Sequence, residues 1–271
     1  MSTSELRRRH ESEGYEHLAS TSSRTEGSSS SQRDASYWSR FSQWIQDSCY
    51  QIMAYTVWDN IVSGFKPGRV RAFELLDIQS RDTVLLVGEG SGLDFECLPE
   101  QTNRAALKAF DFSPQMVRQC KIKAQQLDIP EDNCFVGDAQ NLPFTDERFD
   151  KIYFPLSIAS IPNPSLALEE AERVLSQGGK IVVFDKLVDD AVSITWRRKI
   201  LNIFTRCIFA DINRNLSIIL HNVSDLKIIH YESLEGKLSG ILTKPLGGFY
   251  RIAVIVRDRD FPDQPAIQAH L

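Results

Sequence analysis

The stretch VLLVGEGSG, residues 84–92, decides the fold. Its four leading apolar residues are typical of a short strand that is buried on both faces. Gly88, Gly90 and Gly92 follow that strand at once. A glycine-rich turn lets the backbone approach a ligand closely, and the end of the first strand of a parallel sheet is a ligand-binding position. Taken alone, the pattern also fits a tight strand-to-helix turn without a ligand.

On both sides of this turn, predicted strands alternate with helices. Helices are expected at Ser113–Leu127, after a Ser cap and a first-turn proline, and at Ser165–Leu175, ended by Gly178-Gly179; residues 191–221 are expected to be mainly helical. The predicted strands are Thr83–Val87, Ala105–Phe110, Cys134–Val136, Phe149–Phe154, Lys180–Phe184, Leu226–Tyr231 and Phe249–Val256. This alternation predicts an α/β fold, with a doubly wound, mostly parallel seven-stranded sheet.

Composition divides the chain into four segments. Residues 1–36 are rich in Ser and charge and are expected to be a disordered tail, because they cannot bury enough apolar surface to offset their ordering entropy. Residues 37–78 carry aromatic side chains at helical spacing and are expected to form an N-terminal helical cap. Residues 79–257 hold the alternating domain, and residues 258–271 are expected to be a C-terminal tail.

Charge and cysteine content narrow the function classes. The 271 residues carry a formal net charge of −5, which argues against a nucleic-acid partner. No apolar stretch is long enough to span a bilayer, and no apolar leader is present at the N-terminus. The five cysteines are scattered, without metal-ligand spacing, so we expect no metal site, no disulfide framework and a cytoplasmic setting.

Two acidic residues follow later strands. Asp111 ends the second predicted strand, about twenty residues after the turn, where a carboxylate can accept hydrogen bonds from both ribose hydroxyls of a nucleoside. Asp138 follows the third strand and is suited to accept from an adenine amine. A helix cap is the other use for an acid at such a place, but Ser113 is better positioned for that. A dinucleotide fingerprint would need glycine where Leu93 stands, which argues against an NAD-dependent oxidoreductase.

Five motifs now occur in a fixed order: VLLVGEGSG, AFDFSPQMV (109–117), GDAQNLPF (137–144), RFDKIYF (148–154) and EEAERVLSQGGKIVVFD (169–185). Together they resemble the class I S-adenosylmethionine-dependent methyltransferases. The resemblance implies S-adenosyl-L-methionine as cofactor and S-adenosyl-L-homocysteine as product. The residues it implies for cofactor binding are Gly88, Glu89, Gly90, Gly92, Asp111, Phe112, Met116, Asp138, Ala139 and Tyr153.

One position departs from the family pattern. Many members carry an acid two residues before the first glycine, where this chain has Leu86. Glu89, inside the turn, is a candidate substitute, because the cofactor brings an ammonium and a sulfonium. The alternative is that Glu89 is a loop acid that faces solvent.

A finer resemblance concerns the acceptor of the methyl group. Tyr55 with Gly68-Arg69, Gly92-Leu93-Asp94, residues 210–214 (ADINR) and residues 247–251 (GGFYR) are similar to bacterial phospholipid N-methyltransferases and quinone methyltransferases. A hydrophobic or lipid-like small molecule is therefore the expected acceptor. Residues 196–209 combine basic and aromatic-apolar side chains, which suits peripheral membrane contact. Packing of that apolar face inside the protein is the alternative.

The acceptor half of the site is less defined by the sequence. Tyr55, Tyr153 and His221 are candidate catalytic groups, and Arg69, Asn213, Arg214 and Tyr250 are candidate substrate contacts. His230 is a further possible base, although a lone histidine is more often structural. Three other readings stay open: methylation of a soluble secondary metabolite at O, N or C, a cofactor-binding protein without catalysis, and the oxidoreductase.

Overall fold

The computed structural model describes residues 63–189, 196, 199–200, 202–203, 211–223, 225–239 and 248–267. They form a seven-stranded sheet in the order β3-β2-β1-β4-β5-β7-β6. Its strands are β1 (Val84–Val87), β2 (Leu107–Asp111), β3 (Cys134–Val136), β4 (Phe149–Pro155), β5 (Leu175–Lys186), β6 (Leu226–Ser233) and β7 (Tyr250–Arg257). Each lies within a few residues of its predicted place, and the predicted sheet is confirmed.

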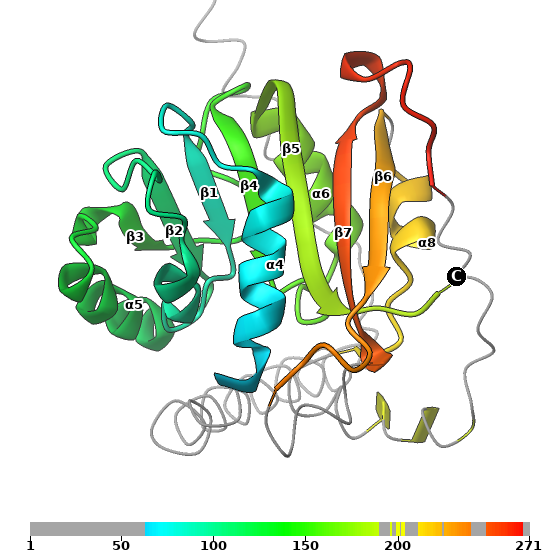
Figure 1. Ribbon diagram of the computed structural model, residues 1–271, viewed down its shortest axis with the longest axis horizontal. Helices are drawn as coiled ribbons and strands as arrows, with labels where there is room; N and C mark the ends of the chain where they lie inside the picture. The colour runs from blue at the N-terminus through cyan, green and yellow to red at the C-terminus, as the bar shows by residue number, and fades with distance from the viewer. Residues whose placement is uncertain are drawn as a thin grey trace, which may run out of the picture. The chain divides into compact units, whose positions relative to one another are not determined.

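Strand β7 is the exception to the parallel arrangement. It runs antiparallel to both of its neighbours, β5 and β6, while the other paired strands run parallel. Figure 1 shows its arrow pointing opposite to those around it. The carboxyl ends of the parallel strands therefore meet at one edge of the sheet, the lower edge in Figure 1. We call it the carboxyl edge.

Helices cover both faces of the sheet. α4 (Lys66–Leu76) and α5 (Pro114–Gln126) pack on one face, where Phe73 and Cys120 meet Leu86. α6 (Pro164–Val174) and α8 (Leu216–His221) pack on the other, where Leu168 and Leu216 join that core. α4 crosses in front of the strands in Figure 1, and α6 lies behind them. The prediction of a doubly wound sheet is thus confirmed.

The sequence signals for helix starts are visible as hydrogen bonds. The Ser113 hydroxyl accepts from the Met116 N–H at 3.4 Å, with Pro114 next in the first turn of α5. Asn163 caps α6 in the same way, and Asn215 caps α8. Each cap satisfies an N–H group that has no partner within its helix.

The predicted helix Ser165–Leu175 is confirmed to within one residue as α6, but the role given to the glycines after it is wrong. Gly178-Gly179 was expected to end the helix, but α6 ends at Val174 and β5 begins directly with Leu175. The two glycines lie inside β5, where the register against β4 shifts. A Cβ on Gly179 would lie 2.9 Å from the Asp150 carbonyl oxygen, and Gly178 has φ +72°. These glycines allow a strand irregularity rather than a helix end.

Short 3-10 helices complete the described chain: η1 (Ser63–Phe65), η2 (Leu93–Cys97), η3 (Glu131–Asn133) and η5 (Asp258–Asp260). The segment predicted as a C-terminal tail folds back in part, because the Ile267 N–H donates to the Ile228 carbonyl at 2.7 Å. The part of the predicted helical cap before residue 63, and residues 1–36, lie outside the described residues. Within the described ranges no helix is long and apolar enough to cross a membrane.

Candidate functional site

The glycine turn after β1 is tied to the end of β2. The N–H groups of Gly88 and Glu89 both donate to the Phe110 carbonyl, at 2.9 and 3.1 Å. The Gly90 N–H donates to Oδ2 of Asp111 at 3.0 Å. The turn and the first predicted acid therefore form one unit at the carboxyl edge.

Gly88 and Gly90 have different reasons to be glycine. Both have positive φ, +74° and +66°, a conformation that other residues adopt with strain. A Cβ on Gly88 would lie 2.5 Å from Cβ of Ser157, so close packing excludes it. A Cβ on Gly90 would have no atom within 4 Å. The space over Gly90 is therefore open, as an approaching ligand requires.

Asp111 keeps acceptor capacity after its internal hydrogen bonds are counted. Oδ2 accepts from Gly90, and Oδ1 accepts from the Ser113 N–H at 2.8 Å. Burial raises the pKa of this carboxyl, and the two N–H donors oppose that rise. Each oxygen of a carboxylate has a second lone pair. Asp111 can therefore accept two further hydrogen bonds, one on each oxygen.

Two exposed apolar side chains flank this carboxylate. Phe112 directly follows β2 and is 67% exposed. Val136 ends β3, pairs in register with Asp111, and is 51% exposed. Large apolar groups on a surface mark contact sites when they are clustered. Their position beside an acceptor-rich carboxylate fits a flat heterocycle attached to a sugar.

The remaining predicted adenine contacts follow β2 and β3: Met116 lies in the first turn of α5, and Asp138 and Ala139 come after β3. Met116 and Ala139 are buried. Oδ1 of Asp138 accepts from the backbone N–H of Gln140 at 2.9 Å and from its side-chain amide at 3.0 Å. The structure thus gathers Phe112, Met116, Asp138 and Ala139 at the ends of two neighbouring strands.

Glu89 points into the protein, so the alternative of a loop acid facing solvent is wrong. Its Oε1 accepts from the Asp94 N–H at 3.1 Å, whereas Oε2 is buried without a hydrogen-bond partner. Burial raises the pKa of Glu89 well above its usual value, and the nearby charge of Asp94 adds to the rise. Leu86, where many family members carry an acid, is fully buried in the apolar core.

Arg69 and Tyr153 meet Glu89 from two other elements. Arg69, on α4, is buried, and its Nε donates to Oδ2 of Asp94 at 3.0 Å. Tyr153, on β4, is fully buried, with its ring 5.0 Å from that of Phe73. Burial, with the neighbouring charge of Asp94, raises the pKa of the Tyr153 hydroxyl well above 10. Sequence reasoning gave Asp94 no role; its one signal was its place directly after Gly92-Leu93.

The other acceptor candidates are divided between the two edges of the sheet. Arg214 lies at the carboxyl edge, where its Nη2 donates to the Ile161 carbonyl at 2.9 Å, and Asn213 precedes it. Tyr250 is buried at the start of β7, and Lys186 Nζ lies 5.7 Å from its ring centroid. His221 ends α8 just before β6 starts at the opposite edge, so it lies away from the glycine turn.

Two candidates have no role assigned by this geometry. His230 lies within β6, the outermost strand on the side away from β1, and its Nε2 is 3.7 Å from Glu232. Tyr55 lies outside the described residues. Among the described side chains, no group of three His, Cys, Asp or Glu residues could hold a metal ion.

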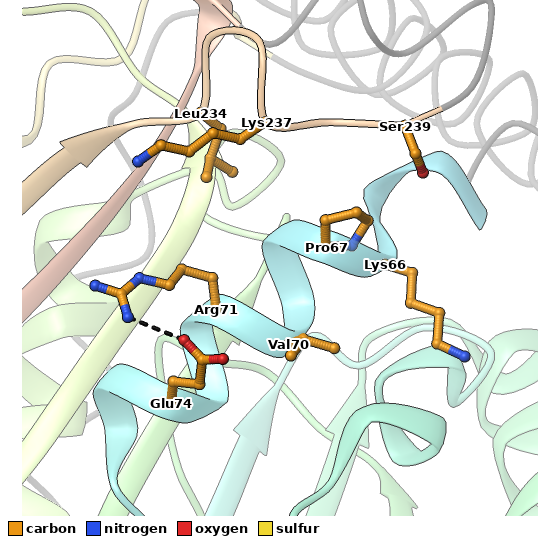
Figure 2. Close-up of a pocket in the computed structure, with 8 residues that line it drawn as sticks. All are labelled: Lys66, Pro67, Val70, Arg71, Glu74, Leu234, Lys237 and Ser239. Atoms are coloured by element: carbon orange, nitrogen blue, oxygen red, sulfur yellow. Dashed lines mark hydrogen bonds and ion pairs between the residues drawn. The ribbon is translucent and has the colours of Figure 1, made fainter.

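A groove elsewhere on the described surface is separate from this site. It measures about 560 Å³ and lies between α4 and the residues after β6 (Figure 2). It is lined by Lys66, Pro67, Val70, Arg71, Glu74, Leu234, Lys237 and Ser239. Arg71 is paired with Glu74, one turn further along α4, at 2.9 Å. None of its lining residues belongs to the glycine turn or the ends of β2 and β3.

The seven-stranded sheet with its antiparallel β7 is the fold that class I methyltransferases share. Residues 85–183, rather more than a third of the chain, match the family described as methyltransferase domain. The match ends at the middle of β5. It thus includes the turn, Asp111 and Asp138, but not the elements that hold Arg69, Arg214 and Tyr250.

Curated relatives each match less than half of the chain. The Bacillus subtilis protein YrhH is 31% identical over 40% of this chain and 59% of its own length. Phosphatidylethanolamine N-methyltransferase of Cereibacter sphaeroides is 32% identical over 40% and 52%. Demethylmenaquinone methyltransferase of Paenarthrobacter aurescens is 30% identical over 48% and 49%. The chain thus spans about half the length of the curated relatives it matches.

Solved structures agree on the fold. Geranyl diphosphate C-methyltransferase from Streptomyces coelicolor superposes with a TM-score of 0.55 at 15% identity, covering 70% of this chain and 80% of that one. The [4+2]-cyclase SpnF gives 0.56 at 15% identity, over 71% and 81%. At this identity the likeness concerns the fold alone. A cyclase among these neighbours shows that this fold hosts more than one reaction.

Proposed function

We propose that this chain is an S-adenosylmethionine-dependent methyltransferase that acts on a hydrophobic or lipid-like small molecule. The proposal that the protein binds this cofactor rests mainly on the hydrogen bonding of Asp111. It is held by two backbone N–H groups, keeps a free lone pair on each oxygen, and lies beside the exposed Phe112. A nucleoside offers two ribose hydroxyls and a flat base to such a pair of residues.

The residues at the carboxyl edge fit this cofactor part by part. The open space over Gly90 admits a group against the backbone. Asp111 is suited to the ribose, and Phe112 and Asp138 to the base. The buried, unpartnered Oε2 of Glu89 is suited to a cationic group at the amino-acid end. No described feature requires a pyrophosphate contact, which an oxidoreductase using NAD would need at this turn.

When bound, the cofactor supplies a methyl group on a sulfonium, whose leaving group is already activated. The protein then contributes alignment and exclusion of water more than acid or base chemistry. This agrees with a site built from backbone turns and buried packing. We therefore assign no general base, and we treat Tyr153 as an interior residue next to Asp94.

The acceptor class rests on two kinds of support. Two of the curated relatives are named for phosphatidylethanolamine and for demethylmenaquinone, both molecules with long apolar chains. Trp196, Ile200 and Ile203 are all exposed, and their spacing of four and three places them on one side of a helix. With Lys199 among them, this side suits transient contact with a membrane that holds the acceptor.

A soluble metabolite is the second candidate acceptor. The fold neighbours named for geranyl diphosphate methylation and for cycloaddition favour it, since neither name refers to a membrane lipid. Both candidates keep the same cofactor site. They differ in where the labelled product is found.

The experiment is transfer of a labelled methyl group from S-adenosylmethionine into a host-cell extract, followed by separation into organic and aqueous phases. Label in the organic phase supports a lipid or quinone acceptor. Label found in the aqueous phase alone contradicts the lipid-like acceptor and leaves the methyltransferase intact. Absence of transfer together with absence of cofactor binding contradicts the proposed function itself.

A matched pair of variants tests whether the transfer of the labelled methyl group depends on Asp111. Asp111→Asn keeps the shape of the side chain and removes its charge, and we expect transfer to fall by about two orders of magnitude, as charged hydrogen bonds contribute roughly 1.5–3 kcal/mol each. Asp132→Asn makes the same change at an exposed aspartate in η3, and should leave transfer unchanged.

A further inference from the structure

Within the part of the chain that the structure describes, a buried group of charges that do not cancel lies next to the glycine turn. Glu89 and Asp94 contribute two carboxyl groups, and Arg69 contributes one guanidinium. Oε2 of Glu89 and Oδ1 of Asp94 are both buried without a hydrogen-bond partner. Unsatisfied buried acceptors are rare in folded proteins, and each one needs a physical reason.

The positive charge of Arg69 is paired with Asp94. Arg69 Nε donates to Asp94 at 3.0 Å, and both side chains are almost fully enclosed. Glu89 accepts the Asp94 backbone N–H on Oε1, and the charge of Arg69 partly opposes the rise in its pKa. An ionised Glu89 would therefore be a buried charge beside a second carboxylate, with one neutral donor.

Among the described residues, the other titratable groups that act on Glu89 do not compensate its negative charge. Tyr153 faces it from β4, Cys134 from β3 and Cys120 from α5. Each of the three is neutral when protonated and would add negative charge if it ionised. Burial disfavours an ionised carboxyl that lacks a counter-charge. A proton on Oε2 makes the Glu89 carboxyl neutral and so avoids this cost.

We propose that Glu89 holds a proton in the ligand-free protein and releases it to solvent when the α-ammonium of the cofactor binds. The O–H bond of the Glu89 carboxyl breaks, the proton leaves with water, and the ammonium keeps its three hydrogens. The bound ammonium supplies the positive charge and the donor that Oε2 lacks. The inference rests on the proposed function, and it adds that cofactor binding is linked to one proton.

Calorimetry can count this proton directly. S-adenosylhomocysteine is the probe, since it carries the α-ammonium without the reactive sulfonium. Titrations at pH 7 in buffers of different ionisation enthalpy give the number of protons released, and we expect close to one for the wild-type protein. Glu89→Gln cannot release a proton and should give a count lower by the same amount. Any contribution from the ligand's own amine is common to both proteins and cancels in the difference.

A second measurement needs no variant. If one proton leaves on binding, the affinity of the wild-type protein for S-adenosylhomocysteine should rise by up to about tenfold from pH 6 to pH 7. Glu96→Gln is the matched control, because Glu96 lies in the same 3-10 helix as Asp94 but pairs with Lys123 at the surface. Its proton count and pH dependence should equal those of the wild type.

The outcomes separate this inference from the proposed function. Binding of S-adenosylhomocysteine to the wild-type protein with no proton release and no rise in affinity between pH 6 and 7 overturns the inference alone. Failure of both S-adenosylmethionine and S-adenosylhomocysteine to bind overturns the proposed function, and the inference with it. If Glu89→Gln does not fold, the wild-type buffer series and the pH series still decide.

Discussion

Two halves of the carboxyl edge hold aspartates in opposite states. In the β5–β7–β6 half, Asp189 accepts from Arg251 at 2.9 and 2.6 Å and from the Tyr231 hydroxyl at 2.8 Å. In the β1–β2–β3 half, Asp111 accepts from two backbone N–H groups and from no side chain in the described contacts. The Asp189 carboxylate accepts its hydrogen bonds from side chains of the protein, whereas the Asp111 carboxylate can still accept hydrogen bonds from a ligand.

The difference shows how to separate structure from function at one edge of a sheet. A carboxylate whose hydrogen-bond partners are a guanidinium and a hydroxyl has a structural role. Asp189 in this way connects the segment after β5 with both β6 and β7. A carboxylate held by main-chain donors is oriented but not neutralised. Burial alone does not distinguish them, since both are largely enclosed. What distinguishes them is the identity of the donors.

The largest effect is expected when the buried ion pair between Asp189 and Arg251 is removed. Arg251→Met leaves Asp189 buried with one hydroxyl donor, and removing one partner of a buried ion pair costs about 3–5 kcal/mol. Urea unfolding should show this loss, while the affinity of the folded protein for S-adenosylhomocysteine stays unchanged. Arg259→Met is the control, because Arg259 is exposed and its pair with Asp225 contributes less than about 1 kcal/mol. Equal losses from both variants would contradict the assignment of Asp189 as a structural tie.

The second prediction compares two glycines. Gly90 and Gly178 have φ of +66° and +72°, and neither would bring a Cβ within 4 Å of another atom. Alanine should destabilise the protein by about 1–2 kcal/mol at either position, because both conformations are left-handed. Cofactor affinity should fall at least about tenfold for Gly90→Ala, roughly 1.4 kcal/mol, and stay unchanged for Gly178→Ala. Parallel urea and binding measurements check this, and equal affinities would show that the space over Gly90 is not used.

The same contrast explains what the sequence could predict. The order of strands, the turn and Asp111 depend on local patterns, namely apolar runs, glycines and a carboxylate at a strand end. The state of Glu89 depends on Asp94, Arg69 and Tyr153, which come from three other elements and meet through packing. No local pattern carries that information. The wrong role predicted for Gly178-Gly179 has a similar origin, since the contact that requires Gly179 lies on β4, at Asp150.

The third prediction concerns the exposed ring at the site. Stacking of a base on an aromatic side chain contributes about 1–3 kcal/mol, so Phe112→Ala should weaken S-adenosylhomocysteine binding by roughly fivefold or more. Because Phe112 is 67% exposed, the fold should lose little stability. Ile122→Ala is the control, since this residue is 51% exposed on α5 and is not part of the site. A Phe112→Ala affinity equal to that of Ile122→Ala would remove Phe112 from the base contacts.

The smallest expected effect is a gain in stability at Glu89. Its pKa is raised in the folded protein, so its contribution to stability is fully present below the unfolded pKa of about 4.3 and is lost as the pH rises toward the folded value. Glu89→Gln does not titrate, so without ligand its Tm should exceed that of the wild type by an amount that grows from pH 5 to pH 8. A difference of about 1 kcal/mol corresponds to roughly 2–4 °C for a domain of this size. Saturating S-adenosylhomocysteine should reverse the order, because the ligand stabilises the protein that binds it more tightly. A variant that melts below the ligand-free wild type at pH 8 would show that Glu89 is needed for the fold, and that its unpartnered oxygen is not held in reserve for the cofactor.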